Sequence, residues 1–366
     1  MTLSVYVRNC NNNPADYYRI GQYIPLLNQA GIDVTVNESV SDSEYWCNIN
    51  SYGKWWRKLF QGLLLVRISL RRRKQILKDL DDRKDVIYIE REMIPRYFPI
   101  FLTSKLTKLT AETKVIWDFD DDIFESEEIS EREQLILLEN SDIVQGIGEY
   151  AGTLIPEKYR GKFVELPTTD DSSGKEKVSE FKSVRENTYD DEFSIVWVGT
   201  ASNLSNLDLV INSLDKAAKE INASSDKEVI LNIICNLPYV RETKYLKIKN
   251  IKWERNLAKE QIRKSHLGIM PLVDGKFQRG KGGFKLIQYL SEGLPVIASE
   301  VGFCREVVTN ECGYLIDADG EWGNTLVNIA TDKELWNRLS ESAFERYLDK
   351  FDFDKYADVL IERINE

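Results

Sequence analysis

The sequence predicts an α/β protein built from two domains, each organised around a parallel sheet. Strand-like and helix-like runs alternate along the whole chain, which is the pattern of parallel α/β domains. The chain has 366 residues, enough for two domains of about 100–200 residues each. Hydrophobic residues make up 42% of it, so each half can bury an ordinary core.

The first half, residues 1–170, is expected to form one domain. Its helical stretches fall at about 17–30, 55–78, 95–111 and 129–140, between the strands. The expected strands are Leu3–Val7, Ile32–Val36, Val86–Ile89, Lys114–Asp118, Asp142–Val144 and Lys162–Leu166.

Residues 171–192 are polar, charged and nearly without periodicity, which predicts a linker or an exposed loop. The alternation then restarts, and residues 193–350 are expected to form the second domain, with a helix at about 203–221. Residues 351–366 end in an amphipathic helix that could pack back on the first domain. The expected strands of the second domain are Ser194–Val198, Val229–Ile234, Ile251–Trp253, Leu267–Leu272, Pro295–Ala298 and Tyr314–Ile316.

Composition narrows the possible functions. No run of eighteen apolar residues occurs, and the start, MTLSVYVRNC, reads as a strand rather than a signal peptide. Five widely spaced cysteines suggest reduced thiols and a cytoplasmic protein. His266 is the single histidine, so the chain lacks the residues for the usual histidine-based catalytic triads and multi-histidine metal sites. We expect His266 to have a structural role. The net charge of −11 argues against nucleic-acid binding.

A glycine-rich, basic loop lies between the strand Leu267–Leu272 and a helix that starts near Phe284. Glycines let backbone amides approach a ligand, and a helix start offers free N–H groups and the positive end of its dipole. Together these features suit a diphosphate, although a solvated basic loop is the plain alternative, and no Walker motif is present. The loop and helix start contain Gly275, Arg279, Gly280, Lys281, Gly282, Gly283 and Lys285.

The segment from Lys281 to Val308, K-x-x-F-K-L-I-Q-Y-L-x-x-G-L-P-V-I-A-S-x-V-G-x-x-x-E-V-V, resembles the donor-binding half of GT-B glycosyltransferases, and most of all glycosyltransferase family 4. Residues 193–199, 89–95 and 117–122 are similar to further segments of that family. The resemblance implies two Rossmann-like domains facing each other across a cleft. It also implies a nucleotide-sugar donor on the second domain, an acceptor on the first, and transfer without a metal or other cofactor, with retention at the anomeric carbon.

The resemblance also implies a set of donor-site residues. Gly199 and Thr200 would approach the diphosphate, and Lys285 would pair with it. The family's glutamate pair falls on Gly280 and Gln288, and its usual Arg–Lys pair after the opening strand is missing. Gln288 could still bind a ribose hydroxyl. The full expected donor set is Gly199, Thr200, Arg279, Lys281, Gly282, Gly283, Phe284, Lys285, Gln288 and Glu306.

Carboxylates follow two strands of the first half. Asp120 and Asp121 come after the strand Lys114–Asp118, and Glu92 follows the strand Val86–Ile89. One of these three could orient an acceptor hydroxyl or act as a base. The alternatives are a solvated turn with Asp122 as a helix cap, a surface ion pair near Glu92, or the metal-binding Asp-x-Asp of GT-A transferases.

Residues 54–78 carry nine basic residues and no acidic one, with apolar residues at helical spacing. Trp55 and Trp56 at one end and Arg71, Arg72 and Arg73 at the other suit a helix lying on an anionic membrane surface. An apolar stripe that simply joins the core, or a patch that binds RNA, are the alternatives.

These observations lead to one functional hypothesis. The chain would be a glycosyltransferase acting on a saccharide or lipid-linked saccharide in bacterial surface polysaccharide assembly, on the cytoplasmic side of the plasma membrane. A nucleotide-sugar epimerase of the same architecture and a non-catalytic nucleotide-sugar-binding subunit are the alternatives. The nucleotide, the sugar and the oligomeric state are not specified by the sequence.

Overall fold

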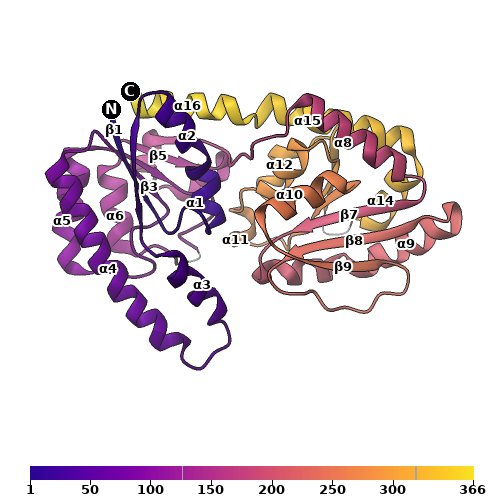
Figure 1. The fold of residues 1–366 in the computed structure, drawn as a ribbon, viewed down its shortest axis with the longest axis horizontal. Coiled ribbons are helices and arrows are strands. Elements are labelled where there is room, and N and C mark those ends of the chain that lie inside the picture. Colours follow the sequence, from indigo (N-terminus) through magenta and orange to yellow (C-terminus); the bar gives the residue numbers. More distant parts are fainter. Residues whose placement is uncertain (126, 318–319) are drawn as a thin grey trace. The chain divides into compact units, whose positions relative to one another are not determined.

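The computed structural model describes residues 1–125, 127–317 and 320–366, which divide into two compact units (Figure 1). Unit 1 comprises Met1–Thr168 and Asp354–Glu366, and unit 2 comprises Thr169–Phe353. Within the described residues each unit contains one six-stranded sheet whose paired strands are all parallel. The predicted α/β class is therefore confirmed.

Unit 1 has the strand order β2-β1-β3-β4-β5-β6. Its strands are β1 (Thr2–Val7), β2 (Asp33–Glu38), β3 (Val86–Glu90), β4 (Lys114–Asp118), β5 (Ile143–Gly146) and β6 (Phe163–Glu165). Its helices are α1 (Pro14–Arg19), α2 (Ile24–Gln29), α3 (Asp42–Asn50), α4 (Arg57–Asp82), α5 (Ile100–Glu112), α6 (Glu131–Asn140), α7 (Gly148–Leu154) and α16 (Phe353–Asn365), with 3-10 turns at Gly21–Tyr23 and Glu157–Lys162.

Unit 2 has the strand order β12-β11-β10-β7-β8-β9. Its strands are β7 (Glu192–Val198), β8 (Glu228–Cys235), β9 (Lys247–Lys252), β10 (Leu267–Met270), β11 (Val296–Ser299) and β12 (Gly313–Ile316). Its helices are α8 (Lys175–Thr188), α9 (Ile211–Ser225), α10 (Arg255–Lys264), α11 (Lys276–Arg279), α12 (Phe284–Ser291), α13 (Cys304–Val307), α14 (Trp322–Thr331) and α15 (Lys333–Lys350), with a 3-10 stretch at Ala201–Leu209.

The strand orders place a reversal point in each sheet. In unit 1 the chain passes from β1 to β2 on one side and then returns to β3 on the other side of β1. In unit 2 it passes from β7 through β8 to β9 and then to β10 on the other side of β7. Ligands of open parallel sheets bind beyond the carboxyl ends of the strands at such reversal points. The loops after β1 and β3, and those after β7 and β10, are therefore the places to examine.

Helix α4 is fixed to the sheet of unit 1 by a buried arginine. Arg72 is fully buried, and its guanidinium donates to the carbonyl oxygens of Val7 (2.8 Å), Asn37 (2.6 Å) and Met93 (2.9 Å). These carbonyls lie at or just past the carboxyl ends of β1, β2 and β3. Arg72 was expected on a membrane surface, and this expectation was wrong, because its three carbonyl partners hold it inside the unit.

Residues 171–192 differ from the expected linker or exposed loop. They contain α8, whose Arg185 is buried and donates to the carbonyl oxygens of Glu292 and Gly293 at 3.1 Å each. The two buried positions of α8, Val178 and Arg185, lie seven residues apart, which is two helical turns. A single narrow contact stripe of this kind gives a weak periodic signal in a helix that is otherwise polar.

Other boundaries depart from expectation for local reasons. The helix expected at 17–30 is broken by a 3-10 turn at Gly21–Tyr23, just before Pro25. Proline lacks a backbone N–H, so the chain starts a new helix there rather than continuing the old one. Strand β9 starts at Lys247, earlier than expected; its first residues are largely exposed and rich in lysine, so they give little apolar signal in the sequence.

His266 has the structural place expected for it. It is buried against Phe193, and its ring nitrogens bond to Ser194 and to the carbonyl oxygen of Arg185. Burial lowers the pKa of His266 to about 4, so the ring is neutral at pH 7. None of the helices in the described part of the chain combines the length and apolar character needed to cross a bilayer.

Replacing Arg72 with lysine should lower the free energy of unfolding by on the order of 2–3 kcal/mol, because one ammonium cannot satisfy three separated carbonyls. Urea denaturation of the full chain measures this change. Arg73→Lys is the matched control, because Arg73 is the next residue and its side chain is exposed. The free energy of unfolding of this variant should stay within about 0.5 kcal/mol of the wild type. Equal stability of the two variants would contradict the anchoring role.

Candidate functional site

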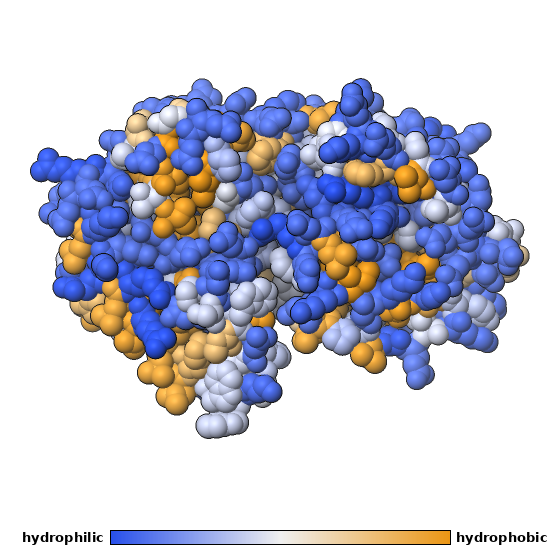
Figure 2. All heavy atoms as spheres, in the orientation of Figure 1, coloured by the Kyte–Doolittle hydropathy of each residue, from blue (hydrophilic) through white to orange (hydrophobic). Residues whose placement is uncertain are grey.

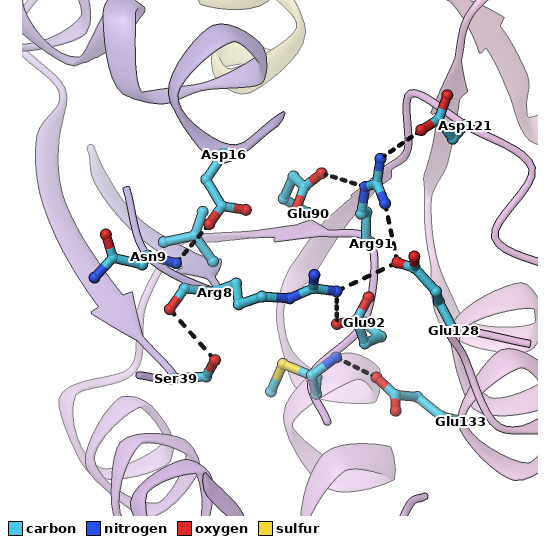
Figure 3. Close-up of polar contacts among 12 residues, drawn as sticks. Arg8, Asn9, Asp16, Ser39, Glu90, Arg91, Glu92, Asp121, Glu128 and Glu133 are labelled. Atoms are coloured by element: carbon cyan, nitrogen blue, oxygen red, sulfur yellow. Dashed lines mark hydrogen bonds and ion pairs between the residues drawn. The ribbon is translucent and has the colours of Figure 1, made fainter. Parts of the chain in front are cut away.

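Charged side chains gather at the reversal point of unit 1. Arg8 follows β1, while Glu90, Arg91 and Glu92 end or follow β3. Register pairs Glu90 with Asp118 at the end of β4, so the residues after β4 lie at the same edge. Figure 3 shows most of this group, which we call the Arg8–Arg91 cluster. Its members are Arg8, Asp16, Glu90, Arg91, Glu92, Asp120, Asp121 and Glu128.

Arg8 links two carboxylates of the cluster. Its guanidinium donates to Glu92 at 2.5 Å and to Glu128 at 3.3 Å (Figure 3). Glu92 is buried, with 4% of its surface exposed, and burial raises its pKa although Arg8 opposes the shift. The side chain of Glu92 is therefore enclosed with Arg8, which suits positioning better than direct contact with a substrate.

Arg91 is the centre of the cluster and has an unusual backbone. Its φ is 58°, in the left-handed region that costs a side-chain-bearing residue roughly 1–3 kcal/mol. Its guanidinium donates to Asp120 (2.9 Å), Asp121 (3.0 Å) and Glu128 (2.9 Å), and its Nε lies 3.2 Å from Glu90. With this backbone conformation the side chain reaches the carboxylates of Asp120, Asp121 and Glu128 in the loop after β4, and these charge-assisted contacts oppose the conformational cost.

The cluster holds more carboxylates than arginines, and its groups differ in acidity. Burial alone would raise the pKa of Glu128, but Arg91 and Arg8 outweigh burial and lower it to about 2. Glu90 is fully enclosed, and its pKa is raised well above the ordinary value, first by burial and then by the neighbouring Asp16 carboxylate. The cluster therefore contains groups suited to both the ionised and the protonated state at neutral pH.

The structure brings the three predicted catalytic carboxylates into this one cluster. Asp120 and Asp121 are partly buried and bound to Arg91, while Glu92 faces Arg8. Asp118 is not part of this group, because it forms a buried ion pair with Arg19 and accepts from Gln145 at 2.8 Å.

The geometry around Asp120, Asp121 and Asp122 bears on two alternatives for this segment, a helix cap and a metal site. Asp122 was considered as a helix cap in a solvated turn, but no helix of the described residues begins beside it and its side chain is buried; it accepts from the backbone amides of Phe124 (3.1 Å) and Glu125 (2.9 Å) and so closes a turn. The carboxylates of Asp120 and Asp121 face the guanidinium of Arg91, a fixed positive charge that would repel a divalent cation. This arrangement fits an organic hydroxyl better than the metal of an Asp-x-Asp motif.

Unit 2 places its glycine-rich loop at its own reversal point. The loop runs from the end of β10 through α11 to the start of α12. Gly283 precedes α12 with a φ of 58°, which a glycine adopts without strain. Gly302, after β11, packs on the backbone of Arg279, where an added Cβ would lie 2.3 Å from the carbonyl oxygen. The loops after β10 and β11 are thus held together.

Three cations lie on this loop and on the first turn of α12. Lys285 is partly buried and near the thiols of Cys235 and Cys304; burial raises the pKa of both thiols, and Lys285 opposes the rise. Lys281 lies over the Phe277 ring, with its nitrogen 4.7 Å from the ring centre. Arg279 is half exposed and makes two hydrogen bonds, of 2.6 and 2.9 Å, to Asp274.

The remaining predicted donor residues have mixed surroundings. Thr200 is exposed after β7, and its hydroxyl accepts from Asn203 at 2.9 Å, while Gly199 packs on the Trp197 ring, only 2.4 Å from an added Cβ. Gln288 is buried and donates to Asp170 at 3.0 Å, so in this structure its amide is engaged within the protein.

Four further predicted donor residues lie on or near the same loops. Gly282 and Gly283 are buried in the loop, Phe284 begins α12 and is half buried, and Glu306 is exposed on α13. They stay predictions as donor contacts.

Sequence reasoning missed part of the cluster in unit 1. Arg8, Asp16, Arg91 and Glu128 were not among the site residues selected from the sequence. Arg8 could have been found, because it immediately follows the first expected strand, Leu3–Val7, at the carboxyl edge where ligands bind. Glu128 lies ten positions after β4, and no local pattern indicates that its chain folds back to Arg91.

Comparisons with known proteins agree with this architecture. Residues 192–332, most of unit 2, match the family model described as "Glycosyl transferases group 1". This match supports the resemblance to glycosyltransferases drawn from the Lys281–Val308 motif, whereas assignment to family 4 stays a prediction. A sequence search of curated proteins finds no match.

Solved structures similar to the whole chain share its fold at low identity. HepE from Anabaena, in complex with UDP, has a TM-score of 0.61 and 13% identity, with 100% of each chain covered. OtsA in its apo form has a TM-score of 0.63 and 12% identity, covering 100% of this chain and 99% of its own. The UDP-GlcNAc 2-epimerase of Methanocaldococcus jannaschii has a TM-score of 0.53 and 15% identity, covering 93% of each chain. These likenesses confirm the GT-B architecture predicted from the sequence.

Glu133 of α6 is a buried carboxyl group beside the cluster, and the effect of burial on its pKa can be tested by experiment. Its carboxylate is buried and accepts from the backbone amide of Met93 (Figure 3), and burial raises its pKa to about 8. The pKa of this carboxyl group is about 8 in the folded protein and near 4.5 in the unfolded chain. Its contribution to the free energy of unfolding is therefore complete below about pH 4.5 and is lost as the pH rises through about 8.

Glu133→Gln should therefore remove a fall in the free energy of unfolding that the wild type shows between about pH 5 and 9. Urea titrations at several pH values measure the fall. Glu131→Gln, an exposed position on the same helix, serves as the control and should keep the wild-type slope. The same slope in Glu133→Gln would show that this carboxyl titrates normally.

Proposed function

We propose that this chain is a glycosyltransferase that moves a sugar from a nucleotide-diphosphate sugar to a hydroxyl of a saccharide acceptor. Unit 2 would hold the donor and unit 1 the acceptor, which we take to be lipid-linked, as in assembly of a bacterial surface polysaccharide. One observation carries the proposal: a cationic, glycine-rich loop lies at the reversal point of unit 2, inside the stretch that matches glycosyl transferases group 1.

The donor site would act on the charge of the leaving group. Negative charge builds on the diphosphate as the bond to the sugar breaks, and fixed cations stabilise that charge. Lys285 is the main candidate because it is partly buried on the first turn of α12, where free amides and the helix dipole add to its effect. Lys281 and Arg279 would add further positive charge, Arg279 after exchanging Asp274 for the diphosphate.

These cations would supply the role that a metal has in other transferases, so we propose transfer that needs no metal ion and no other cofactor. Retention at the anomeric carbon belongs to the same proposal, on the strength of the Lys281–Val308 motif. HepE, which shares the fold, was solved with UDP and with UDP-glucose, so uridine diphosphates are the first ligands to try.

The acceptor site would be the Arg8–Arg91 cluster. Asp120 and Asp121 are two of the partly exposed carboxylates of this cluster, and each could accept a hydrogen bond from an acceptor hydroxyl while Arg91 holds the carboxylate in place. Arg8 with Glu92 would support Arg91 indirectly, since both arginines bind Glu128.

Lys285→Ala should weaken binding of the nucleoside diphosphate at least about tenfold, because one charge-assisted contact to the diphosphate is lost. Isothermal titration calorimetry in the presence of EDTA measures the affinity. Lys216→Ala removes an exposed lysine of α9 and should bind as the wild type does. Unchanged affinity in Lys285→Ala would remove this residue from the donor site.

Asp120→Asn and Asp121→Asn should lower kcat while leaving donor affinity unchanged, and a base among them should cost about 10²–10⁴ in rate. Asp81→Asn, an exposed aspartate of α4, is the control for loss of a carboxylate in unit 1. Full transfer rates in both variants would exclude these carboxylates from the reaction.

Product analysis separates the proposal from its two alternatives. A glycosyltransferase releases free nucleoside diphosphate in step with an extended saccharide. An epimerase would convert the nucleotide sugar with no acceptor present, whereas a binding subunit would return it unchanged with every acceptor tried.

A further inference from the structure

The long helix α4 carries a second apolar face in addition to the one that joins the core. Leu64, Ile68 and Ile76 are buried on its inner side. On the opposite side an apolar row stays exposed, at spacings of four, three and four residues that keep it on one helical face. The row is Leu59 (68% exposed), Leu63 (59%), Val66 (58%) and Leu70 (59%).

The segment before α4 extends this face. Trp55 is 92% exposed and Tyr52 is 73% exposed, and α3 adds Trp46 and Ile49. Arg71, near the middle of α4, binds Glu44 at 2.9 Å and the carbonyl oxygen of Ser39, which holds α3 beside α4. Figure 2 shows apolar side chains gathered over this region, whose ribbon is seen in Figure 1. We call the exposed row together with Trp46, Ile49, Tyr52 and Trp55 the α4 face.

Basic side chains border the α4 face. Residues 54–78 contain no acidic residue, in a protein of net charge −11. Of their nine basic residues, Arg72 is buried and Arg71 is bound within unit 1, whereas six stay exposed near the apolar row. The six are Lys54, Lys58, Arg67, Arg73, Lys74 and Lys78.

This combination defines the partner. An exposed apolar row with aromatic rings at one end and lysines and arginines along its sides is the pattern of a helix lying in the interface of an anionic bilayer. We propose that the α4 face docks on a membrane surface rich in anionic phospholipid, with Leu59, Leu63, Val66 and Leu70 in the acyl boundary and the six basic residues on the headgroups. Trp56, which is half buried against Phe60, and Arg72 take no part.

The docking surface lies on the same side of unit 1 as the Arg8–Arg91 cluster. Arg72 marks the carboxyl edge of the sheet, and α4 runs from there toward its own start over residues 57–71. At about 1.5 Å per residue this segment is roughly 22 Å long. The cluster also lies at this edge, so a bound bilayer would face the acceptor site; this consequence, unlike the docking itself, rests on the proposed function.

Flotation of the full chain with vesicles tests the docking. We expect binding to vesicles of phosphatidylcholine with 30% phosphatidylglycerol, much weaker binding to pure phosphatidylcholine, and loss of binding as salt rises. Leu63→Glu/Val66→Glu should bind on the order of tenfold more weakly, and so should Arg73→Glu/Lys74→Glu. Leu135→Glu, an exposed leucine of α6, is the control and should bind like the wild type.

Circular dichroism of the same proteins shows whether each variant is folded. Titration with a nucleoside diphosphate shows whether the proposed donor site is functional. Variants that stay folded and bind vesicles like the wild type would overturn the docking proposal. The proposal would also be overturned if the wild type did not bind anionic vesicles but eluted as a dimer in size-exclusion chromatography, and if Leu63→Glu/Val66→Glu abolished that dimer. The α4 face would then bind a second copy of the chain. Vesicle binding without nucleotide binding would leave the docking intact and contradict only the proposed donor site.

Discussion

The structure depends on one topological constraint, repeated in each unit. In a parallel sheet all strands end at the same edge, and where the connections on the two sides of a central strand leave in opposite directions, the loops at that edge separate and leave room for a ligand. Arg8 and Arg91 occupy this place in unit 1, and the glycine-rich loop with Lys281 and Lys285 occupies it in unit 2. Features of the sequence that look unrelated, such as a basic residue after β1 and a run of glycines after β10, thus have the same structural position.

The two reversal points carry opposite charge. In unit 1 carboxylates outnumber arginines, and Arg91 adopts a left-handed backbone to bind Asp120, Asp121 and Glu128 at once. In unit 2 the loop and helix start present lysines and an arginine together with the amino end of α12. The first arrangement suits neutral, hydroxyl-rich molecules that donate hydrogen bonds, and the second suits a diphosphate. This difference is the physical basis for assigning acceptor and donor to different units.

The fold was largely predictable from the sequence, since an expected strand overlaps each strand of the two sheets, although for β9 the overlap is only Ile251 and Lys252. Helix α8 was missed because only Val178 and Arg185 face the interior, and α3 was missed although Ser41 and Glu44 form a capping box that the sequence displays. The site was less predictable. Asp120, Asp121 and Glu92 were proposed from the sequence as candidate catalytic residues, and they lie in one cluster. Glu128 joins them only through chain folding, and nothing local shows that Arg72 turns inward while Arg73 stays exposed. Long-range partners of charged side chains are set by tertiary packing, which single-sequence patterns do not encode.

The central claim is that unit 2 binds a nucleoside diphosphate through its own cations. The most direct measurement is a titration calorimetry series of the full chain with uridine, guanosine, adenosine, cytidine and thymidine diphosphates, each in EDTA and again with magnesium. The account predicts saturable one-to-one binding of one of them, with the same affinity in both conditions. Binding that appears only with magnesium, or no binding of any diphosphate, would contradict it.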